Sequence, residues 1–304
     1  MNSGIKCGYV TILGLPNAGK STLMNALLGQ KLSITTSKPQ TTRKKILGIL
    51  SSDSYQVIFL DTPGIIKPNY LLQEKMMEAV GDSIKDADVI VLIIDIFSDP
   101  EGKETLKNIF VSEKVLSSKK PLLLLFNKID LTRQENVKQL ISNFESLNKF
   151  RKVIPVAALL NFNIEEVLSS IIELLPEGPK LYPDDIVADE NERFFVSEIV
   201  RGKIFELYKE EIPYSTEVII IDFTEREDKK DYILAEIIVE RESQKGILIG
   251  KKGVAIKKLG LEARKTVEEF LQKDVYLELK VKVKGKWRSD EKQLKSFGYS
   301  KPKD

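Results

Sequence analysis

The sequence predicts an α/β domain with a doubly wound, mostly parallel sheet, followed by a smaller α+β domain. Three observations predict this arrangement. The length of 304 residues is about twice the usual size of one domain. Short apolar runs alternate with longer helical patterns over residues 8–175, and the order of elements changes beyond a stretch rich in Pro, Gly and Asp. A hydrophobic content of 42% is enough to build a core.

The first domain is expected over residues 1–175. Several of its strand-like runs are apolar on both faces, as strands covered by helices on both sides must be. The expected strands are Gly8–Leu13, Ile46–Ser51, Gln56–Asp61, Val89–Asp95, Leu122–Asn127 and Lys152–Val156. The expected helices are Ser21–Leu28, Tyr70–Ile84, Gly102–Leu116, Gln134–Leu147 and Ile164–Leu174. Such alternation is typical of a doubly wound α/β domain.

Residues 176–190 are predicted to form a linker, because Pro, Gly and Asp interrupt the pattern there. The second domain is expected over residues 191–304, including a C-terminal tail. Its predicted elements are a helix near Asn191–Glu210, strands Thr216–Thr224 and Tyr232–Arg241, a helix–turn–helix over Gly246–Leu271 and a strand Val275–Val283. This order, α-β-β-α-α-β, indicates an α+β domain.

Charge and composition exclude several classes of function. The net charge of +2 is a cancellation, since residues 1–180 carry +3, residues 181–240 carry −10 and residues 241–304 carry +9. The basic final segment indicates an anionic partner. The absence of His excludes imidazole bases and ligands, and the single Cys7 fits a reducing cytosol. No apolar run is long enough to span a bilayer, so a soluble cytoplasmic protein is expected.

A phosphate-binding loop is predicted at Gly14-Leu-Pro-Asn-Ala-Gly19-Lys20-Ser21, which matches G-x-x-x-x-G-K-[ST]. The loop follows an apolar strand and opens a helix, where backbone N–H groups and the helix dipole favour phosphate. Lys20 is expected to reach the β- and γ-phosphate oxygens and Ser21 to ligate Mg²⁺. The nucleotide-binding residues expected in this loop are Asn17, Ala18, Gly19, Lys20, Ser21 and Thr22.

Two further motifs each end an apolar strand. In Asp61-Thr-Pro-Gly64, Asp61 is expected to hold Mg²⁺ through water and the Gly64 N–H to contact the γ-phosphate. In Asn127-Lys128-Ile-Asp130, the carboxylate of Asp130 can accept hydrogen bonds from N1–H and the exocyclic amine of guanine. Adenine has no donor at N1, so guanine is the predicted base. A plain strand-end turn and a helix cap are the alternatives for the two motifs.

Thr41 and Thr42 lie between the first expected helix and the next strand. Either hydroxyl could reach Mg²⁺ and report on the γ-phosphate. An ordinary Thr-rich loop is the alternative interpretation.

Together, GLPNAGKST, the Thr-Thr-Arg of KPQTTRKK, DTPG and NKID resemble the translation-factor-type GTPases and, more narrowly, the Era family of bacterial ribosome-assembly GTPases. The resemblance covers essentially the whole chain and implies a P-loop GTPase domain followed by a type II KH domain. It implies that Thr42 is the switch Thr and a metal ligand. It further implies that Ala157 and Ala158 form the fifth guanine motif, in which Ala157 replaces the usual Ser.

The expected cofactors are GTP or GDP and Mg²⁺, and the resemblance implies that Asn17 helps to hold K⁺. Residues expected to act in hydrolysis are Asn17, Lys20, Thr42 and Gly64. Ile65 stands where Ras-like enzymes carry a water-positioning Gln, so intrinsic hydrolysis should be slow. Arg43 is a competing source of positive charge, although a solvated loop arginine is the favoured interpretation.

A G-x-x-G loop in the C-terminal domain joins two helices, and its setting resembles that of a type II KH domain, which clamps about four single-stranded nucleotides. The expected RNA-binding residues are Ile247, Ile249, Gly250, Lys251, Lys252, Gly253, Ile256 and Lys257. Core packing is the alternative for the isoleucines. Lys280 and Lys282 are expected to protect an edge strand, with direct RNA contact as the alternative. Trp287 is expected to be a packing anchor, with stacking on a base as the alternative.

The resemblance implies that the partner is small-subunit ribosomal RNA near its 3′ end, with a role in 30S subunit assembly. It also implies a peripheral membrane association, for which the sequence offers no amphipathic anchor. A monomer is expected. One alternative is a constitutive RNA-binding structural protein with a vestigial nucleotide site, which the intact Lys20 and Asp61 disfavour. Another is an ATP-driven P-loop enzyme such as a helicase, which Asp130 disfavours.

Overall fold

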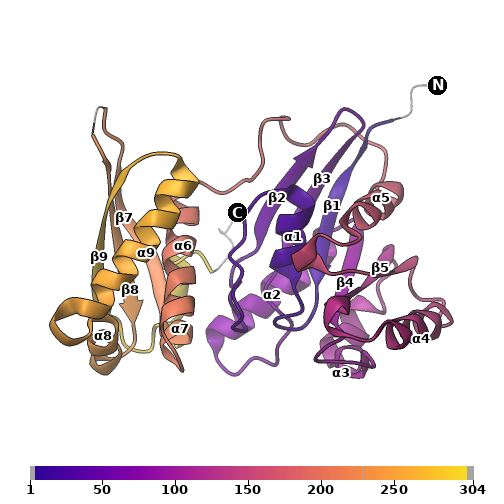
Figure 1. The fold of residues 1–304 in the computed structure, drawn as a ribbon, viewed down its shortest axis with the longest axis horizontal. Coiled ribbons are helices and arrows are strands. Elements are labelled where there is room, and N and C mark those ends of the chain that lie inside the picture. Colours follow the sequence, from indigo (N-terminus) through magenta and orange to yellow (C-terminus); the bar gives the residue numbers. More distant parts are fainter. Residues whose placement is uncertain (1–3, 228, 300–304) are drawn as a thin grey trace. The chain divides into compact units, whose positions relative to one another are not determined.

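The computed structural model describes residues 4–227 and 229–299, and it divides into two compact units (Figure 1). The first unit contains residues up to 189 except for 69–75. The second unit contains residues 69–75 and the chain from 190 onward. Each unit has its own sheet and its own hydrophobic core.

The first unit contains a six-stranded sheet in the order β2-β3-β1-β4-β5-β6. β2 runs antiparallel to β3, and the other neighbours are parallel. This confirms the predicted doubly wound, mostly parallel sheet. The strands are β1 Lys6–Leu13, β2 Ile46–Ser51, β3 Tyr55–Asp61, β4 Val89–Asp95, β5 Leu122–Asn127 and β6 Lys152–Pro155.

Helices cover both faces of this sheet, which explains why β4 and β5 are buried at every residue (Figure 1). The helices are α1 Lys20–Leu28, α2 Leu71–Asp86, α3 Lys103–Lys107, α4 Gln134–Glu145 and α5 Ile164–Leu174. Val80 of α2 and Val137 of α4 share one apolar cluster with Leu92 and Leu124 of the sheet. α1 and α5 pack on the other face.

The single helix predicted over Gly102–Leu116 is wrong, because the chain leaves the helical conformation at Asn108. α3 ends at Lys107, Asn108 is extended (φ −60°, ψ 124°), and a π-helical turn follows over Val111–Val115. The Asn108 Oδ1 accepts a hydrogen bond from the Phe110 N–H at 3.0 Å. Asn commonly competes with a helix in this way, by bonding the backbone through its side chain.

The segment predicted as a linker is hydrogen-bonded to the first unit along much of its length. The Cys7 N–H donates to the Pro176 carbonyl at 3.0 Å, and the Ile49 N–H on β2 donates to the Val187 carbonyl at 2.8 Å. Between these points the Gln56 side-chain oxygen accepts the N–H groups of residues 181 and 182. Residues 176–187 therefore lie against the sheet.

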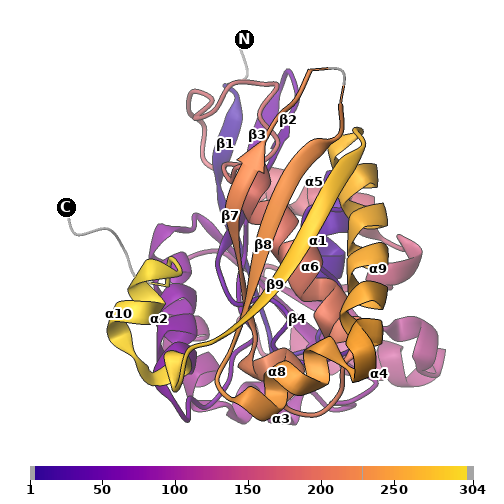
Figure 2. The ribbon, with the colours of Figure 1, turned by 90° about the vertical axis from the view of Figure 1, so that its left-hand side faces the viewer.

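The second unit has a three-stranded sheet in the order β7-β8-β9 (Figure 2). β7 and β8 are antiparallel, whereas β8 and β9 are parallel. The main elements are α6 Glu192–Leu207, β7 Glu217–Thr224, β8 Asp231–Val239, α8 Glu242–Ile249, α9 Val254–Leu271 and β9 Val275–Val283. Their order confirms the expected type II KH arrangement. Asn191 caps α6, since its side chain accepts the Phe194 N–H at 3.0 Å.

Three short helical segments of the second unit were not predicted: α7 Ile212–Ser215, a 3₁₀ turn Trp287–Ser289 and α10 Glu291–Ser296. Trp287 is fully buried, its indole N–H donates to the Ser215 carbonyl at 2.9 Å, and its ring meets Phe297 edge-on. The expected role of Trp287 as a packing anchor is thus confirmed.

Candidate nucleotide site and candidate nucleic-acid interface

A cavity of about 300 Å³ opens at the carboxyl ends of the strands in the first sheet. β1 lies between β3 and β4, so the connections leaving these ends diverge there, as at ligand sites of open α/β sheets. Sequence-predicted residues that line the cavity are Asn17, Gly19, Lys20, Ser21, Thr22, Thr42, Gly64, Asn127, Lys128, Asp130 and Ala158. The structure thus gathers residues of five separate motifs around one cavity.

Three glycines at this cavity have no room for a side chain. At Gly14 a Cβ would lie 2.5 Å from the Ile93 carbonyl oxygen. At Gly64 it would lie 2.8 Å from the Cα of Pro16 in the phosphate loop. Gly19 has φ +100°, and its Cβ would lie 2.2 Å from the side chain of Asn127. Gly14 and Gly64 thus let backbone approach backbone, and Gly19 leaves room for the Asn127 side chain.

The three predicted metal ligands contact one another directly. The Ser21 hydroxyl donates to Asp61 Oδ2 at 2.8 Å, and the Thr42 hydroxyl lies 2.9 Å from that of Ser21. Asp61 is fully buried. Its other oxygen, Oδ1, meets no donor at hydrogen-bond distance among the described residues. Two hydroxyls beside a buried carboxylate with an unpartnered oxygen form the oxygen-rich setting in which Mg²⁺ and its waters bind.

Two opposite charges lie buried in this cluster. Burial lowers the pKa of Lys20 to about 8, against a smaller opposing effect of Asp61. Burial likewise raises the pKa of Asp61, while the hydrogen bond from Ser21 and the charge of Lys20 offset part of that rise. Lys20 Nζ donates to the Leu15 carbonyl at 2.9 Å. Because both charges have lost water, a phosphate beside Lys20 and a cation beside Asp61 would relieve them.

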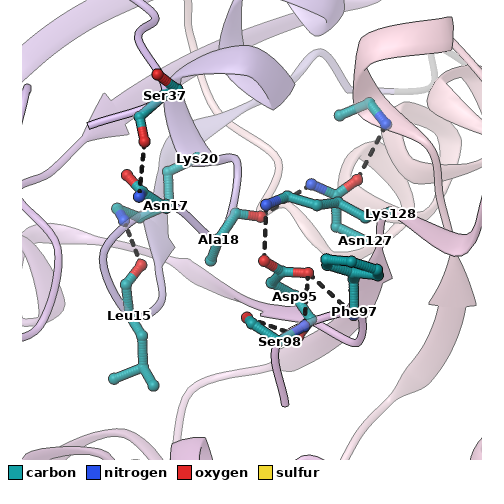
Figure 3. Close-up of polar contacts among 11 residues, drawn as sticks. Leu15, Asn17, Ala18, Lys20, Ser37, Asp95, Phe97, Ser98, Asn127 and Lys128 are labelled. Atoms are coloured by element: carbon teal, nitrogen blue, oxygen red, sulfur yellow. Dashed lines mark hydrogen bonds and ion pairs between the residues drawn. The ribbon is translucent and has the colours of Figure 1, made fainter. Parts of the chain in front are cut away.

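The loop that carries Thr42 is tied to the phosphate loop through Asn17, as Figure 3 shows. Asn17 has a left-handed backbone (φ +63°), and its side-chain amide donates to the Ser37 carbonyl at 3.0 Å. The Thr41 hydroxyl is engaged inside the loop, 2.6 Å from Thr36 Oγ1. Of the two threonines left open by the sequence, the structure therefore brings Thr42 to Ser21.

Asn127 joins two motifs to the phosphate loop (Figure 3). Its amide nitrogen donates to the Ala18 carbonyl at 2.8 Å, and its oxygen accepts the Ala158 N–H at 3.0 Å. The family resemblance also implies that the Ala158 N–H meets the guanine oxygen O6. That role stays a prediction, since this N–H is donated to Asn127 here. Ala157 is buried and does not line the cavity, so the structure places it behind the site.

Lys128 lies at the end of the cavity where guanine recognition was predicted, and its side chain is held by an ion pair. Its backbone is left-handed (φ +65°), and its Nζ forms an ion pair with Asp95 at 2.6 Å (Figure 3). Asp130, two residues further on, has an exposed side chain that lines the cavity. Sequence reasoning missed Leu131 and Leu159, which line the same end and are 55% and 81% exposed. Two exposed leucines here offer apolar surface to a flat base.

Sequence reasoning also missed a clamp behind the metal ligands. The Asn25 side chain binds the N–H and carbonyl groups of Ser33 at 2.9 and 2.8 Å. Ser33 is buried, and its hydroxyl offsets part of the pKa rise of Asp61 although the two side chains lie beyond hydrogen-bond distance. A Ser and an Asn eight residues apart carry no motif, so no sequence signal marks them.

Arg43 and Ile65, two residues with sequence-based expectations about hydrolysis, are both buried. Arg43 is only 4% exposed, so its interpretation as a solvated loop arginine is wrong. Ile65 is 1% exposed, and its N–H donates to the Gly14 carbonyl at 3.0 Å. An apolar side chain buried in the core cannot orient water.

The G-x-x-G loop of the second unit has the backbone that its glycines allow. Gly250 has φ +70° with ψ 171°, a combination open essentially to Gly, and Gly253 has φ +77°. A Cβ on Gly253 would meet nothing within 4 Å, so the loop leaves open space there. Lys251 and Lys252 are both exposed, which presents two positive charges at this opening.

A groove of about 450 Å³ follows this loop between α9 and β9. Its lining residues are Ile256, Lys257, Gly260, Leu261, Arg264, Tyr276, Leu277, Glu278 and Leu279. Ile256 and Lys257 were predicted, whereas Leu261, Arg264 and Tyr276 were missed because they belong to no motif. Ile247 and Ile249 lie on α8, and the structure does not bring them into this groove.

β9 is an edge strand, as expected from its lysines. Lys280 pairs with Glu278 and Lys282 with Glu236, each at 3.2 Å. Charges at an edge hinder pairing with another strand. The edge position of β9 is thus confirmed, and the protective role of its lysines stays a prediction.

Comparison with known families assigns both units. Residues 9–128 match the model described as "50S ribosome-binding GTPase", and residues 211–288 match the KH domain model. The chain is 42% identical over 295 residues to GTPase Era of Clostridium kluyveri, covering 97% of this chain and 99% of that protein.

The chain belongs to the Era family of GTPases.

An Era-family relative from Arabidopsis thaliana, GTPase ERA-like, chloroplastic, is 46% identical over 98% of this chain and 70% of its own length. Two solved Era structures match with a TM-score of 0.91, and each covers 97% of this chain. One is a variant of Aquifex aeolicus Era bound to GDP and AlF4⁻, at 39% identity. The other is Era with MgGDPNP and nucleotides 1506–1542 of 16S ribosomal RNA, at 38% identity. Among the described residues of this Era-family chain, every helix is too short or too polar to cross a membrane.

Proposed function

We propose that this GTPase is a molecular switch that binds GTP with Mg²⁺, holds the 3′ end of 16S ribosomal RNA in its KH domain and assists assembly of the 30S subunit. The observation that carries the nucleotide part is the direct cluster of Ser21, Thr42 and Asp61, with an unpartnered buried oxygen on Asp61. The RNA part is supported by the open G-x-x-G loop and by the Era structure that holds 16S nucleotides 1506–1542.

In this proposal each residue has a definite task in hydrolysis. Lys20 leaves the Leu15 carbonyl to contact the β- and γ-phosphate oxygens, and the Gly64 N–H meets the γ-phosphate. Ser21 and Thr42 would hold Mg²⁺, and Asp61 would hold it through water. When bound, the ion would neutralise the charge that develops on the phosphate oxygens. When the γ-phosphate departs, Thr42 and Gly64 lose a contact, and their loops are released.

The proposed domain limits are residues 1–175 for the GTPase domain, 176–190 for the connection and 191–304 for the KH domain. The proposed site residues are those expected from the sequence. Ile247 and Ile249 remain proposed without support from the groove, because they do not line it. A cytoplasmic monomer with a peripheral association at the inner face of the membrane stays a prediction.

Crosslinking tests the proposed switch and its partner together. The full-length protein is incubated with 16S ribosomal RNA and Mg²⁺, with GDP in one sample and a non-hydrolysable GTP analogue in the other. We expect crosslinks within nucleotides 1506–1542, and a yield that changes with the nucleotide. Equal crosslinking in both states, combined with no multiple-turnover hydrolysis, would instead support a constitutive RNA-binding protein with a vestigial nucleotide site.

We further propose that K⁺ raises the slow intrinsic hydrolysis rate through Asn17. The Asn17 side-chain amide donates a hydrogen bond to the Ser37 carbonyl, which brings the oxygens of both groups close together. Carbonyl and amide oxygens are the groups that replace water around K⁺ in proteins. Turnover should therefore be at least several-fold faster in KCl than in NaCl at equal ionic strength. An Asn17→Asp variant should lose most of this difference. Equal rates in the two salts, or a full K⁺ response in the variant, would contradict the proposal.

A further inference from the structure

A column of stacked side chains crosses the outer part of the second sheet and ends in an exposed ring. Tyr232 on β8 and Tyr276 on β9 are directly paired across the two strands. Their rings are stacked, with centroids 6.0 Å apart and planes inclined by 16°. The guanidinium of Arg226 lies over the Tyr232 ring, 5.4 Å from its centroid. The Arg226 guanidinium and the two tyrosine rings thus form a column of three planar groups.

The column is open at one end because of its place in the sheet. Arg226 belongs to the connection between β7 and β8, whereas Tyr276 lies on β9, the strand on the other side of β8 from β7. In the sheet order β7-β8-β9 no further strand follows β9. Tyr276 is 57% exposed although its ring is packed on Tyr232. Its solvent-facing side is therefore free to take another planar group.

The inner part of the column is held in place. The Tyr232 hydroxyl donates to Glu278 Oε2 at 2.7 Å, and Glu278 pairs with Lys280 at 3.2 Å. The Arg226 N–H also donates to Asp231 Oδ1 at 2.8 Å. A stack that is already ordered loses little conformational freedom when a further ring joins it.

Tyr276 lies at the end of the groove that is distant from the G-x-x-G loop. α9 starts beside that loop at Val254, and Arg264, which lines the groove with Tyr276, is ten residues further, or about 15 Å along the helix. Figure 2 shows α8 near one end of α9 and the start of β9 near the other. Because the loop clamps about four nucleotides, an RNA chain that reaches Tyr276 does so with nucleotides beyond those four.

We propose that the exposed ring of Tyr276 is a base-stacking subsite for single-stranded RNA, which extends the KH groove past the nucleotides held by the G-x-x-G loop. This inference rests on the proposed RNA-binding function. Aromatic side chains are sequence-tolerant platforms because every base has a π-face. Arg264, which lines the groove beside Tyr276, supplies a positive charge for the phosphate that leads to the stacked base. The subsite thus adds length and affinity to the RNA segment bound.

The test compares variants of the full-length protein for binding to nucleotides 1506–1542 of 16S ribosomal RNA and to versions shortened stepwise to four nucleotides. Tyr276→Leu keeps an apolar side chain but removes the π-face, whereas Tyr276→Phe keeps the ring. Ile221→Ala is the matched control, since Ile221 is 50% exposed on β7, at the other edge of the same sheet. 2-Aminopurine placed at successive positions reports stacking by loss of fluorescence.

We expect Tyr276→Leu to raise the Kd of the longer RNAs about tenfold, and Tyr276→Phe and Ile221→Ala to change it less than twofold. The difference should vanish for the four-nucleotide RNA, and one 2-aminopurine position should regain fluorescence in Tyr276→Leu alone. The dependence of Kd on salt should be unchanged, because no phosphate contact is lost.

Equal binding by wild type and Tyr276→Leu, or an equal loss on every RNA length, would overturn the subsite. These outcomes leave the KH groove itself intact. Failure of the wild-type protein to bind any of the RNAs would instead overturn the proposed RNA-binding function, and the subsite with it. Circular dichroism and the thermal midpoint of each variant separate these results from misfolding.

Discussion

A variant with both Lys251→Glu and Lys252→Glu is expected to lose RNA binding by on the order of 100-fold at 0.1 M salt. Both lysines are exposed in the G-x-x-G loop, where phosphates can approach because the glycines carry no side chain. The substitutions replace two favourable phosphate contacts with two repulsive ones. Kd for nucleotides 1506–1542 of 16S ribosomal RNA, measured over a series of salt concentrations, is the direct readout. The slope of log Kd against log salt should fall by about 2.

The matched control for this variant is Lys209→Glu with Lys295→Glu. These two lysines are exposed in the same domain, and their replacement changes the net charge by the same amount. If the control weakens RNA binding equally, the effect comes from total charge and the loop is not the clamp. GTP binding, measured with a fluorescent analogue, should be unchanged in both variants. A collapse of GTP binding in the loop variant would contradict the separation of the two functions.

Asp130→Asn is expected to convert the nucleotide site from guanine to xanthine. The carboxylate can accept the N1–H and the exocyclic amine of guanine, and a bidentate contact of this kind discriminates by roughly 1–3 kcal/mol. The Asn amide cannot accept from that amine, but it can donate to the C2 carbonyl of xanthine and accept its N1–H. GTP affinity should therefore fall about 10- to 100-fold, while affinity for xanthosine triphosphate should rise above it.

Competition between the two nucleotides for a fluorescent GDP analogue measures this change. Glu135→Gln removes one carboxylate from an exposed position on α4, and it should leave the preference for GTP intact. A variant Asp130→Asn that still prefers GTP would show that other groups select the base. Tight ATP binding by the wild-type protein would favour the ATP-driven alternative.

Most of the fold follows from patterns that are local in the sequence. Both ends of the buried strands β4 and β5 were predicted correctly. A short, unbroken apolar run is typical of a strand buried on both faces. The break at Asn108 was missed, because an Asn whose side chain competes for the backbone looks the same as one on a helix surface. α10 was also missed, because a helix of six residues has too few turns to show a helical repeat of apolar residues.

The candidate sites divide in the same way. Ser21, Asp61 and Asp130 could be proposed from the sequence because phosphate, metal and guanine chemistry each impose a residue type at a fixed spacing. Asn25 and Tyr276 were not found, because their roles depend on neighbours from elsewhere in the chain, namely Ser33 and Tyr232. Pairs of this kind are created by the fold and leave no motif.

The contact between residue 187 and β2 bears on how the protein is made. β2 is an outer strand of the first sheet, and its Ile49 N–H is satisfied by the Val187 carbonyl. During synthesis β2 emerges from the ribosome long before residue 187 does. Until then the strand is an open edge to which another nascent chain can pair. The segment around residues 187 and 188 therefore covers part of this edge. A chain truncated before it is expected to aggregate more readily, even with every nucleotide-binding residue present.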